Sequence, residues 1–372
     1  MILDVLLIKQ KNRTLEIINP FYSLFFKYNK NLLVVIVITK NLKRSILIYF
    51  DVIFSMLIWN VNQNIFGNPF LPCFILSTTT FLIIYTPFEI YWSFADLWYD
   101  RWISLSLKDC VTKYERIEVG HKRNKKKEIA TLLVSSKDKE LVENKNSIII
   151  IAHGFSDTKE SLQNYFLPFS QLGYVILSYD ARGTGKSKKV GRRSHFLKRI
   201  EDFEKILKWV SMNEDLNKKR IYCIGFSIGA LSVLCGGFKN EVIDKIIAIS
   251  AISNYRKNLP RFNVIVMLSY FLNGVKLFPK REENLKLSPS FMISQIKRNL
   301  PEEKWRNLCN RVLLIHSRND KIIKMINFEE NAEVLDLPEE NRLIINKGGH
   351  THKKNELILV GRSIKFLESN SN

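Results

Sequence analysis

Short apolar runs alternate with amphipathic segments along the last two thirds of the chain. The runs predict strands of a buried sheet, and the segments between the later runs repeat apolar residues at helical spacing. Strands are expected at residues 116–119, 129–134, 148–152, 175–179, 221–225, 245–250, 312–316 and 343–345, and helices at 160–171, 196–212, 228–238, 327–335 and 356–367. The alternation predicts an α/β fold with a mostly parallel eight-stranded sheet, an antiparallel pair at its start and helices on both faces.

The first third of the chain has a different pattern. Residues 52–88 contain no charged side chain, and an Asn-rich stretch divides them into two apolar segments, about 45–60 and 68–88. A membrane-spanning helix needs about 20 predominantly apolar residues. We therefore expect a transmembrane helical hairpin, followed by interfacial aromatic residues between Tyr91 and Trp102. One span plus a buried or interfacial helix is the alternative, because the first segment is short and contains Asp51.

The flanking charges predict the orientation of the hairpin. Basic residues precede it at Lys40, Lys43 and Arg44 and follow it at 122–127, whereas the connecting loop is uncharged. The positive-inside rule then places both ends, and the α/β domain, on the cytoplasmic side. The expected organisation is an N-terminal segment 1–43, a membrane anchor with its aromatic stretch 44–109, and an α/β domain 110–372. A cleavable signal peptide is not expected, because the earliest apolar run, 32–39, is too short.

A Gly-x-Ser-x-Gly motif carries the first candidate for chemistry. The apolar run 221–225 leads into Gly225, Ser227 and Gly229, and a predicted helix follows directly. A serine on such a sharp strand-to-helix turn is exposed to a substrate. The glycines allow the close packing of the turn, and the helix N-terminus offers backbone N–H groups to an oxyanion. Ser227 is therefore the candidate nucleophile.

An acid and a base follow Ser227 in the order that a catalytic triad needs. Asp320 lies in a polar turn after the strand 312–316, and His350 lies in a Gly-Gly-His loop after the last strand. Both strand ends are expected at the same edge of the sheet as Ser227. His350 is the predicted base, and His352, two residues further on, is the alternative.

The loop after the strand 148–152 predicts the second half of an oxyanion hole. It reads His153-Gly154-Phe155, and the N–H groups of Phe155 and Ile228 are the expected donors. The later string from Asp180 to Ser187, Asp-x-Arg-Gly-x-Gly-x-Ser, has neither the P-loop nor the dinucleotide-binding spacing and is interpreted as a structural turn.

Taken together, these motifs resemble the α/β-hydrolase family, and in particular its serine aminopeptidase-like and monoacylglycerol-lipase-like esterase branch. The resemblance covers about residues 115–368. It implies a serine hydrolase fold and triad without implying a substrate. Residues 254–310 form a long insertion between the sixth and seventh strands, which in this family commonly resembles a lid over the acyl pocket. A longer crossover packed on the sheet is the alternative interpretation.

The amino-acid composition limits the kinds of binding partner and cofactor that this chain is expected to have. The formal charge is +21, yet no nucleic-acid-binding module is recognisable, so anionic lipid headgroups beside the anchor are the favoured partner of the basic runs 122–127 and 186–193. Five unpatterned cysteines fit a reducing compartment. The histidines show no metal-binding spacing, and no metal or cofactor is expected.

These features predict a membrane-anchored serine hydrolase that cleaves carboxylic esters, with lipophilic acyl esters favoured. A peptidase would use the same triad, and so would an acyltransferase that transfers the acyl group to an alcohol. A catalytically silent, membrane-tethered interaction protein is the alternative from another class. The sequence does not indicate an oligomeric state.

Overall fold

The computed structural model describes residues 40–98, 110–122, 125–216, 219–259, 264–352 and 355–369. It contains two compact units, Met1–Glu89 and Ile90–Asn372, and each is considered by itself. Nearly all of the predicted segment 1–43 lies outside the described residues, as do residues 99–109 of the aromatic stretch. The boundaries expected after residues 43 and 109 remain predictions.

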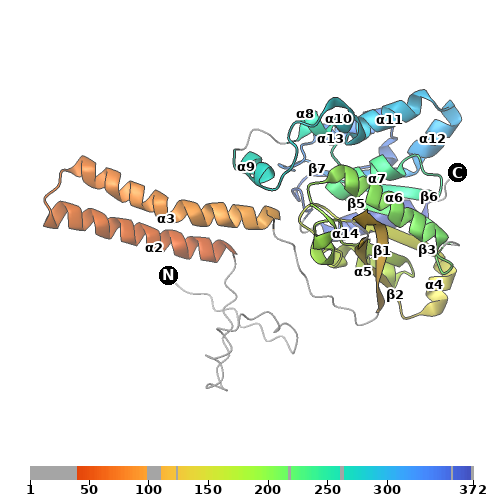
Figure 1. Ribbon diagram of the computed structural model, residues 1–372, viewed down its shortest axis with the longest axis horizontal. Coiled ribbons are helices and arrows are strands. Elements are labelled where there is room, and N and C mark those ends of the chain that lie inside the picture. Colours follow the sequence, from red (N-terminus) through yellow and green to blue (C-terminus); the bar gives the residue numbers. More distant parts are fainter. Residues whose placement is uncertain are drawn as a thin grey trace, which may run out of the picture. The chain divides into compact units, whose positions relative to one another are not determined.

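An eight-stranded sheet forms the centre of the larger unit (Figure 1). Its spatial order is β1-β2-β4-β3-β5-β6-β7-β8. β1 pairs antiparallel with β2, β2 pairs antiparallel with β4, and the remaining pairs are parallel. The strands are β1 Cys110–Lys122, β2 Lys125–Ser136, β3 Ser147–Ala152, β4 Val175–Tyr179, β5 Arg220–Phe226, β6 Ile243–Ile249, β7 Val312–Ser317 and β8 Arg342–Ile345. The predicted fold class is confirmed, with a longer antiparallel pair than the sequence pattern indicated.

Helices cover both faces of this sheet, because the side chains of each strand alternate between two cores. Ile148 and Ile150 of β3 pack with α6, α7, α12 and α13, whereas Ile149 and Ile151 pack with α5 and α14. The covering helices are α5 Gln163–Gln171, α6 Phe196–Met212, α7 Ile228–Gly237, α12 Glu302–Asn310, α13 Ile326–Val334 and α14 Glu356–Glu368. A short helix that the sequence analysis did not identify, α4 Lys139–Lys145, precedes β3 and is capped by Asp138.

The insertion between β6 and β7 contains two kinds of structure. Ile293 of α11 and Trp305 of α12 belong to the sheet core, as expected of a crossover. Tyr255 of α8 and Tyr270 of α9 instead belong to a third apolar cluster, beyond the ends of the strands. We call this first half, residues 254–259 and 264–288, the cap. The helices in the described part of the insertion are α8 Tyr255–Asn258, α9 Val264–Leu272, α10 Arg281–Lys286, α11 Pro289–Arg298 and α12.

Two long helices, α2 Lys40–Asn60 and α3 Phe70–Trp98, form an antiparallel hairpin joined through the π-helical turn η1, Val61–Ile65. The hydroxyl of Ser77 on α3 donates a hydrogen bond to the Ser55 carbonyl on α2 at 2.7 Å. By length and composition, Arg44–Ile65 and Phe70–Trp92 could each cross a membrane. Most of their large apolar side chains are exposed, whereas Asp51, which argued against a first span, is only 2% exposed.

The segment from Asp180 to Ser187 follows β4 directly and forms a buried polar network near the carboxyl ends of β3 and β4. The Asp180 carboxylate accepts hydrogen bonds from the Lys159 ammonium at 2.8 Å and from the Lys159 and Lys186 backbone N–H groups. Lys159 and Asp180 are fully buried. Gly185 leaves room for the carboxylate, because a Cβ there would lie 2.4 Å from it. The string is therefore a structural turn, as predicted.

We expect Asp180→Asn to destabilise the fold strongly. Removing one partner of a buried ion pair typically costs about 3–5 kcal/mol, and we expect the lower end of this range because Lys159 Nζ also lies 2.7 Å from Glu160 Oε1. The measurement is urea-induced unfolding of the detergent-solubilised protein, followed by circular dichroism. Glu201→Gln is the control, because the Lys198–Glu201 pair is exposed and should contribute less than about 1 kcal/mol. Equal unfolding midpoints for the two variants would contradict this role of Asp180.

Candidate active site

Ser227 occupies the tight turn between β5 and α7. Its backbone angles, φ 54° and ψ −115°, lie in a region that residues with side chains rarely adopt, at a cost of about 1–3 kcal/mol. Gly225 and Gly229 make the turn possible. A Cβ on Gly229 would lie 2.0 Å from the Ala152 carbonyl oxygen, and one on Gly225 would lie 2.6 Å from the Ala230 nitrogen. Close packing of backbone against backbone therefore requires glycine at both positions.

The structure brings Ser227, His350 and Asp320 into one hydrogen-bonded chain. His350 Nε2 lies 2.9 Å from Ser227 Oγ, and His350 Nδ1 lies 2.8 Å from Asp320 Oδ2. The loops after β7 and β8 are also joined directly, since Asn319 Oδ1 accepts a hydrogen bond from Gly349 N at 2.8 Å. The predicted nucleophile, base and acid thus meet at the carboxyl edge of the sheet.

Local hydrogen bonds determine the charge of Asp320. Burial alone would raise the pKa of this carboxyl group, but the hydrogen bond from His350 and the backbone N–H groups of Ile322 and Ile323 hold the pKa below its usual value. Asp320 is therefore ionised at neutral pH and accepts a hydrogen bond from the Nδ1–H group of His350. That tautomer leaves the Nε2 lone pair directed at the Ser227 hydroxyl.

The loop 153–155 lies directly against the serine turn. A Cβ on Gly154 would be 3.7 Å from the Ser227 Cβ and 3.7 Å from the Phe226 carbonyl oxygen. Ile228 is the first residue of α7, and N–H groups in the first turn of a helix have no acceptor within that helix. The helix dipole adds partial positive charge at this end. The two predicted oxyanion donors, Phe155 and Ile228, thus belong to the segments that adjoin Ser227.

Buried side chains hold the loop 153–155 in place. His153 Nε2 accepts a hydrogen bond from Ala181 N at 2.9 Å, so its Nδ1 carries the proton and donates to the Gly154 carbonyl at 2.7 Å. Burial and then the Arg199 charge hold the pKa of His153 well below its usual value, which keeps the ring neutral. The predicted supporting motif residues His153 and Gly154 therefore act here through the shape of the loop.

Arg199 of α6 is a residue of this site that the sequence analysis missed. It is 3% exposed, and its Nη2 donates to the carbonyl oxygens of His153 at 3.0 Å and Gly154 at 3.2 Å. Burial lowers the pKa of Arg199 to about 10, so it remains a cation at neutral pH. No sequence signal identifies it, because its contacts lie about 45 residues away along the chain.

His352, the alternative base, has a different environment. It is 1% exposed, and its Nε2 lies 2.9 Å from the hydroxyl of Ser250, the residue after β6. Burial and then the neighbouring His350 lower the pKa of His352 to about 4. His352 is therefore neutral at physiological pH and bonds to a serine other than the one in the Gly-x-Ser-x-Gly turn.

The third apolar cluster includes Ile228, the residue next to Ser227. It joins Ile228 and the partly buried Phe155 to cap residues, among them Tyr255 and Val275. The aromatic rings are continuous: Phe155 contacts Phe196 with ring centres 5.9 Å apart, and Phe196 contacts Tyr255 at 5.8 Å. The cap and the oxyanion segments thus share one apolar wall.

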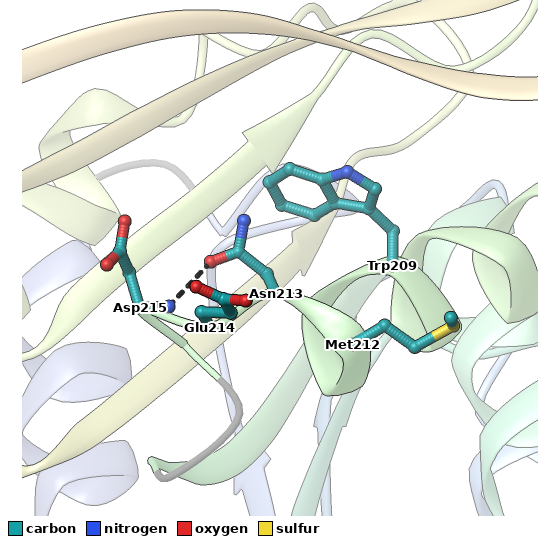
Figure 2. Close-up of a pocket in the computed structure, with 5 residues that line it drawn as sticks. All are labelled: Trp209, Met212, Asn213, Glu214 and Asp215. Carbon is teal, nitrogen blue, oxygen red and sulfur yellow. Dashed lines mark hydrogen bonds between the residues drawn. The ribbon is translucent and has the colours of Figure 1, made fainter.

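A separate hollow of about 410 Å³ is lined by Trp209, Met212, Asn213, Glu214 and Asp215 (Figure 2). It lies at the end of α6 that leads into the start of β5, the opposite edge of the sheet from Ser227. The backbone N–H of Asp215 donates a hydrogen bond to Asn213 Oδ1. The lining contains no serine, cysteine or histidine. This hollow is therefore distinct from the candidate active site. In the described part of the chain, no group of three or more His, Cys, Asp or Glu residues is arranged to hold a metal ion.

Comparisons with known proteins agree with this architecture. Residues 143–299 match the family described as serine aminopeptidase, S33. The chain is similar to an acylaminoacyl peptidase from Pyrococcus horikoshii, with 19% identity and a TM-score of 0.50 over 71% of this chain and 42% of the peptidase. It is also similar to an esterase from Pyrococcus furiosus, with 21% identity and a TM-score of 0.47 over 72% of this chain and 94% of the esterase. A comparison with curated proteins finds no match. At these identities the structural likeness concerns the fold.

We expect His352 to make stability depend on pH. Its pKa falls from 6.5 to about 4 on folding, so between these values the unfolded chain binds a proton that the folded chain does not. The free energy of unfolding therefore decreases as the pH falls through this window, by on the order of 3 kcal/mol from this residue. His352→Asn should flatten the dependence, measured by urea unfolding at several pH values. The exposed His121→Asn is the control, and a slope unchanged by His352→Asn would contradict the assignment.

Proposed function

We propose that the chain is a serine hydrolase of the α/β-hydrolase superfamily and that it cleaves lipophilic carboxylic esters. One observation carries this proposal: Ser227, His350 and Asp320 form a continuous hydrogen-bonded chain beside the helix N-terminus and the loop 153–155. A serine needs such an activating base to act as a nucleophile at neutral pH.

The proposed reaction has two steps. Ser227 Oγ attacks the ester carbonyl as His350 Nε2 takes its proton, and the N–H groups of Phe155 and Ile228 stabilise the oxyanion. His350 then returns the proton to the departing alcohol, which leaves an acyl-enzyme. Water attacks the acyl carbonyl with His350 again as base, and this releases the acid and restores Ser227. Asp320 stays ionised throughout and stabilises the imidazolium.

Two features favour a lipophilic acyl group. The wall that joins the cap to Phe155 and Ile228 is apolar, so an acyl chain placed there would lose its contact with water. The hairpin α2–α3 is long and apolar enough to attach the enzyme to a bilayer, where such esters are concentrated. We further propose that both ends of the hairpin face the cytoplasm and that basic surface runs favour anionic headgroups.

A serine peptidase is the second candidate. It is favoured by the match of residues 143–299 to a family described as serine aminopeptidase. The same residues would also serve an acyltransferase if an alcohol replaced water in the second step. A catalytically silent interaction protein is disfavoured, because such a protein would have no need for a complete Ser227–His350–Asp320 hydrogen-bonded chain.

Labelling with a fluorophosphonate probe tests the nucleophile. We expect the native, detergent-solubilised protein to be labelled and Ser227→Ala to remain unlabelled, because the probe reacts with an activated serine. Heat-denatured protein is the control for non-specific reaction. Absence of labelling in folded native protein would refute the hydrolase proposal. If the native protein is labelled, a screen from short-chain to long-chain esters and aminoacyl amides would separate an esterase from a peptidase.

Substitutions of His350 and His352 should have very different effects on catalysis. We expect His350→Ala to lower kcat by roughly three orders of magnitude or more, because Ser227 loses its base. His352→Asn should retain most of the activity at neutral pH, since His352 bonds to Ser250. Steady-state hydrolysis of a soluble ester measures both variants, with circular dichroism as a control for folding. An inactive, folded His352→Asn variant together with an active His350→Ala variant would reverse the assignment.

A further inference from the structure

Helix α9 of the cap presents two contrasting faces. Tyr270 points inward, packs into the apolar cluster that contains Ile228, and has its pKa raised to about 12 by burial. Leu268 is 49% exposed, Phe271 73% and Leu272 63%, and Phe278 just beyond the helix is 65% exposed. These four side chains are large, and they leave apolar area in water at the outer surface of the cap.

Basic side chains border these apolar residues. Lys276, Lys280 and Arg281 follow α9 within nine residues and are exposed, and Lys276 also pairs with Glu283 at 2.6 Å. Arg192, from the loop before α6, also reaches this point, because a Cβ on Gly274 would lie 3.7 Å from its guanidinium. The charges of Arg192 and Lys276 both contribute to lowering the pKa of His195, after burial and Arg182. We define the α9 surface as Leu268, Phe271, Leu272 and Phe278 with the basic residues Arg192, Lys276, Lys280 and Arg281.

We propose that the α9 surface docks on the lipid bilayer, with its apolar residues at the boundary between headgroups and acyl chains and its basic residues at anionic headgroups. Exposed aromatic and aliphatic side chains next to lysine and arginine are the combination that binds a helix in the membrane interface. This inference rests on the proposed membrane attachment. It adds a second, peripheral contact made by the catalytic unit itself.

The chain itself argues for a bilayer as the occupant. Only residues 99–109 separate the end of α3 from the start of β1, and a chain of this length reaches at most roughly 40 Å. If α2 and α3 span a membrane, the catalytic unit remains close to the lipid surface. The residues 254–310 are also positively charged, with eleven Lys or Arg against four Asp or Glu, which complements an anionic leaflet.

Docking through α9 would connect the bilayer to the candidate active site. The Tyr255 hydroxyl donates a hydrogen bond to the Lys276 carbonyl at 3.1 Å, directly after α9. The rings of Tyr255, Phe196 and Phe155 then lead to the oxyanion segment. Tyr255 and Phe196 are buried, so these ring contacts join the cap to the oxyanion segment. Docking at α9 would bring this part of the catalytic unit to the lipid, so the substrate class is an ester already dissolved in the membrane.

Site-specific fluorescence tests the proposal on the full chain. All five native cysteines are buried, so a single introduced cysteine can be labelled with an environment-sensitive fluorophore. The positions are Phe271→Cys in the α9 surface, Met212→Cys at the opposite sheet edge, 69% exposed, and Ile83→Cys in α3, 67% exposed. The proteins are reconstituted in vesicles of phosphatidylcholine, with and without phosphatidylglycerol, that contain a doxyl-labelled quencher lipid.

We expect quenching at positions 271 and 83 and none at 212, with stronger quenching at 271 when phosphatidylglycerol is present. Quenching at 83 alone would overturn docking while leaving the membrane anchor in place. No quenching at 83 would refute the proposed anchor. A blue-shifted but unquenched probe at 271 would mean that protein covers α9, such as a second copy of the chain, and would also overturn the proposal.

A kinetic test separates docking from catalysis. The double variant Phe271→Ser/Leu272→Ser should lose about tenfold or more in the hydrolysis of a long-chain ester presented in vesicles, and should keep its rate on a soluble short-chain ester. Met212→Ser is the matched control and should keep both rates. Equal loss on both substrates would indicate damage to the catalytic site and would overturn the docking role. If the unaltered protein hydrolyses no ester, the proposed function fails, whereas the quenching result still stands on its own.

Discussion

The contact between three backbone segments around Ser227 is the constraint on which the rest of the structure depends. Gly229 at the start of α7 lies against the carbonyl of Ala152 at the end of β3, with no space for a side chain. That contact holds α7 under the edge of the sheet and forces Ser227 into its left-handed conformation. It also brings the loop 153–155 to the serine, because this loop continues from Ala152. Nucleophile and oxyanion segments are thus positioned by one packing interaction.

Buried charges complete the positioning. Arg199 binds the carbonyls of His153 and Gly154, and the Asp180 carboxylate ties the turn after β4 to Lys159. Such groups are costly to bury, and their hydrogen bonds to the His153 and Gly154 carbonyls and between Lys159 and Asp180 offset part of that cost. Arg199 fixes the direction of the His153 and Gly154 carbonyls and so holds the conformation of the loop that adjoins Ser227.

The membrane features divide between two parts of the chain. The hairpin α2–α3 has the length and apolarity of a transmembrane anchor, whereas α9 is short, exposed on one side and packed on the other. An anchor of the first kind limits how far the catalytic unit can move from lipid. A surface of the second kind would control which face of that unit meets the lipid. In the proposed docking, the apolar cluster that joins α9 to Ile228 would lie near the lipid, which suits the proposed lipophilic ester substrate.

The sequence alone determined the features that depend on local periodicity and on short motifs. Strand and helix alternation predicted the sheet, the uncharged stretch 52–88 predicted two long helices, and Gly225-x-Ser227-x-Gly229 predicted a strand-to-helix turn. Each of these features depends on residues that are close together in the sequence, because the steric and hydrophobic preferences that determine them are local. The order of Ser227, Asp320 and His350 added the candidate triad, because chain order is visible without coordinates.

Only the tertiary structure decided between residues that are alike in sequence. His350 and His352 are both loop histidines. His350 forms a hydrogen bond with Ser227, 123 residues away, whereas His352 forms one with Ser250. The sequence also did not predict the role of Arg199, the exposure of α9 or the division of the insertion into a cap and a crossover. All of these depend on contacts between segments far apart in the chain. Such contacts arise from close packing of the whole domain, so no local pattern records them.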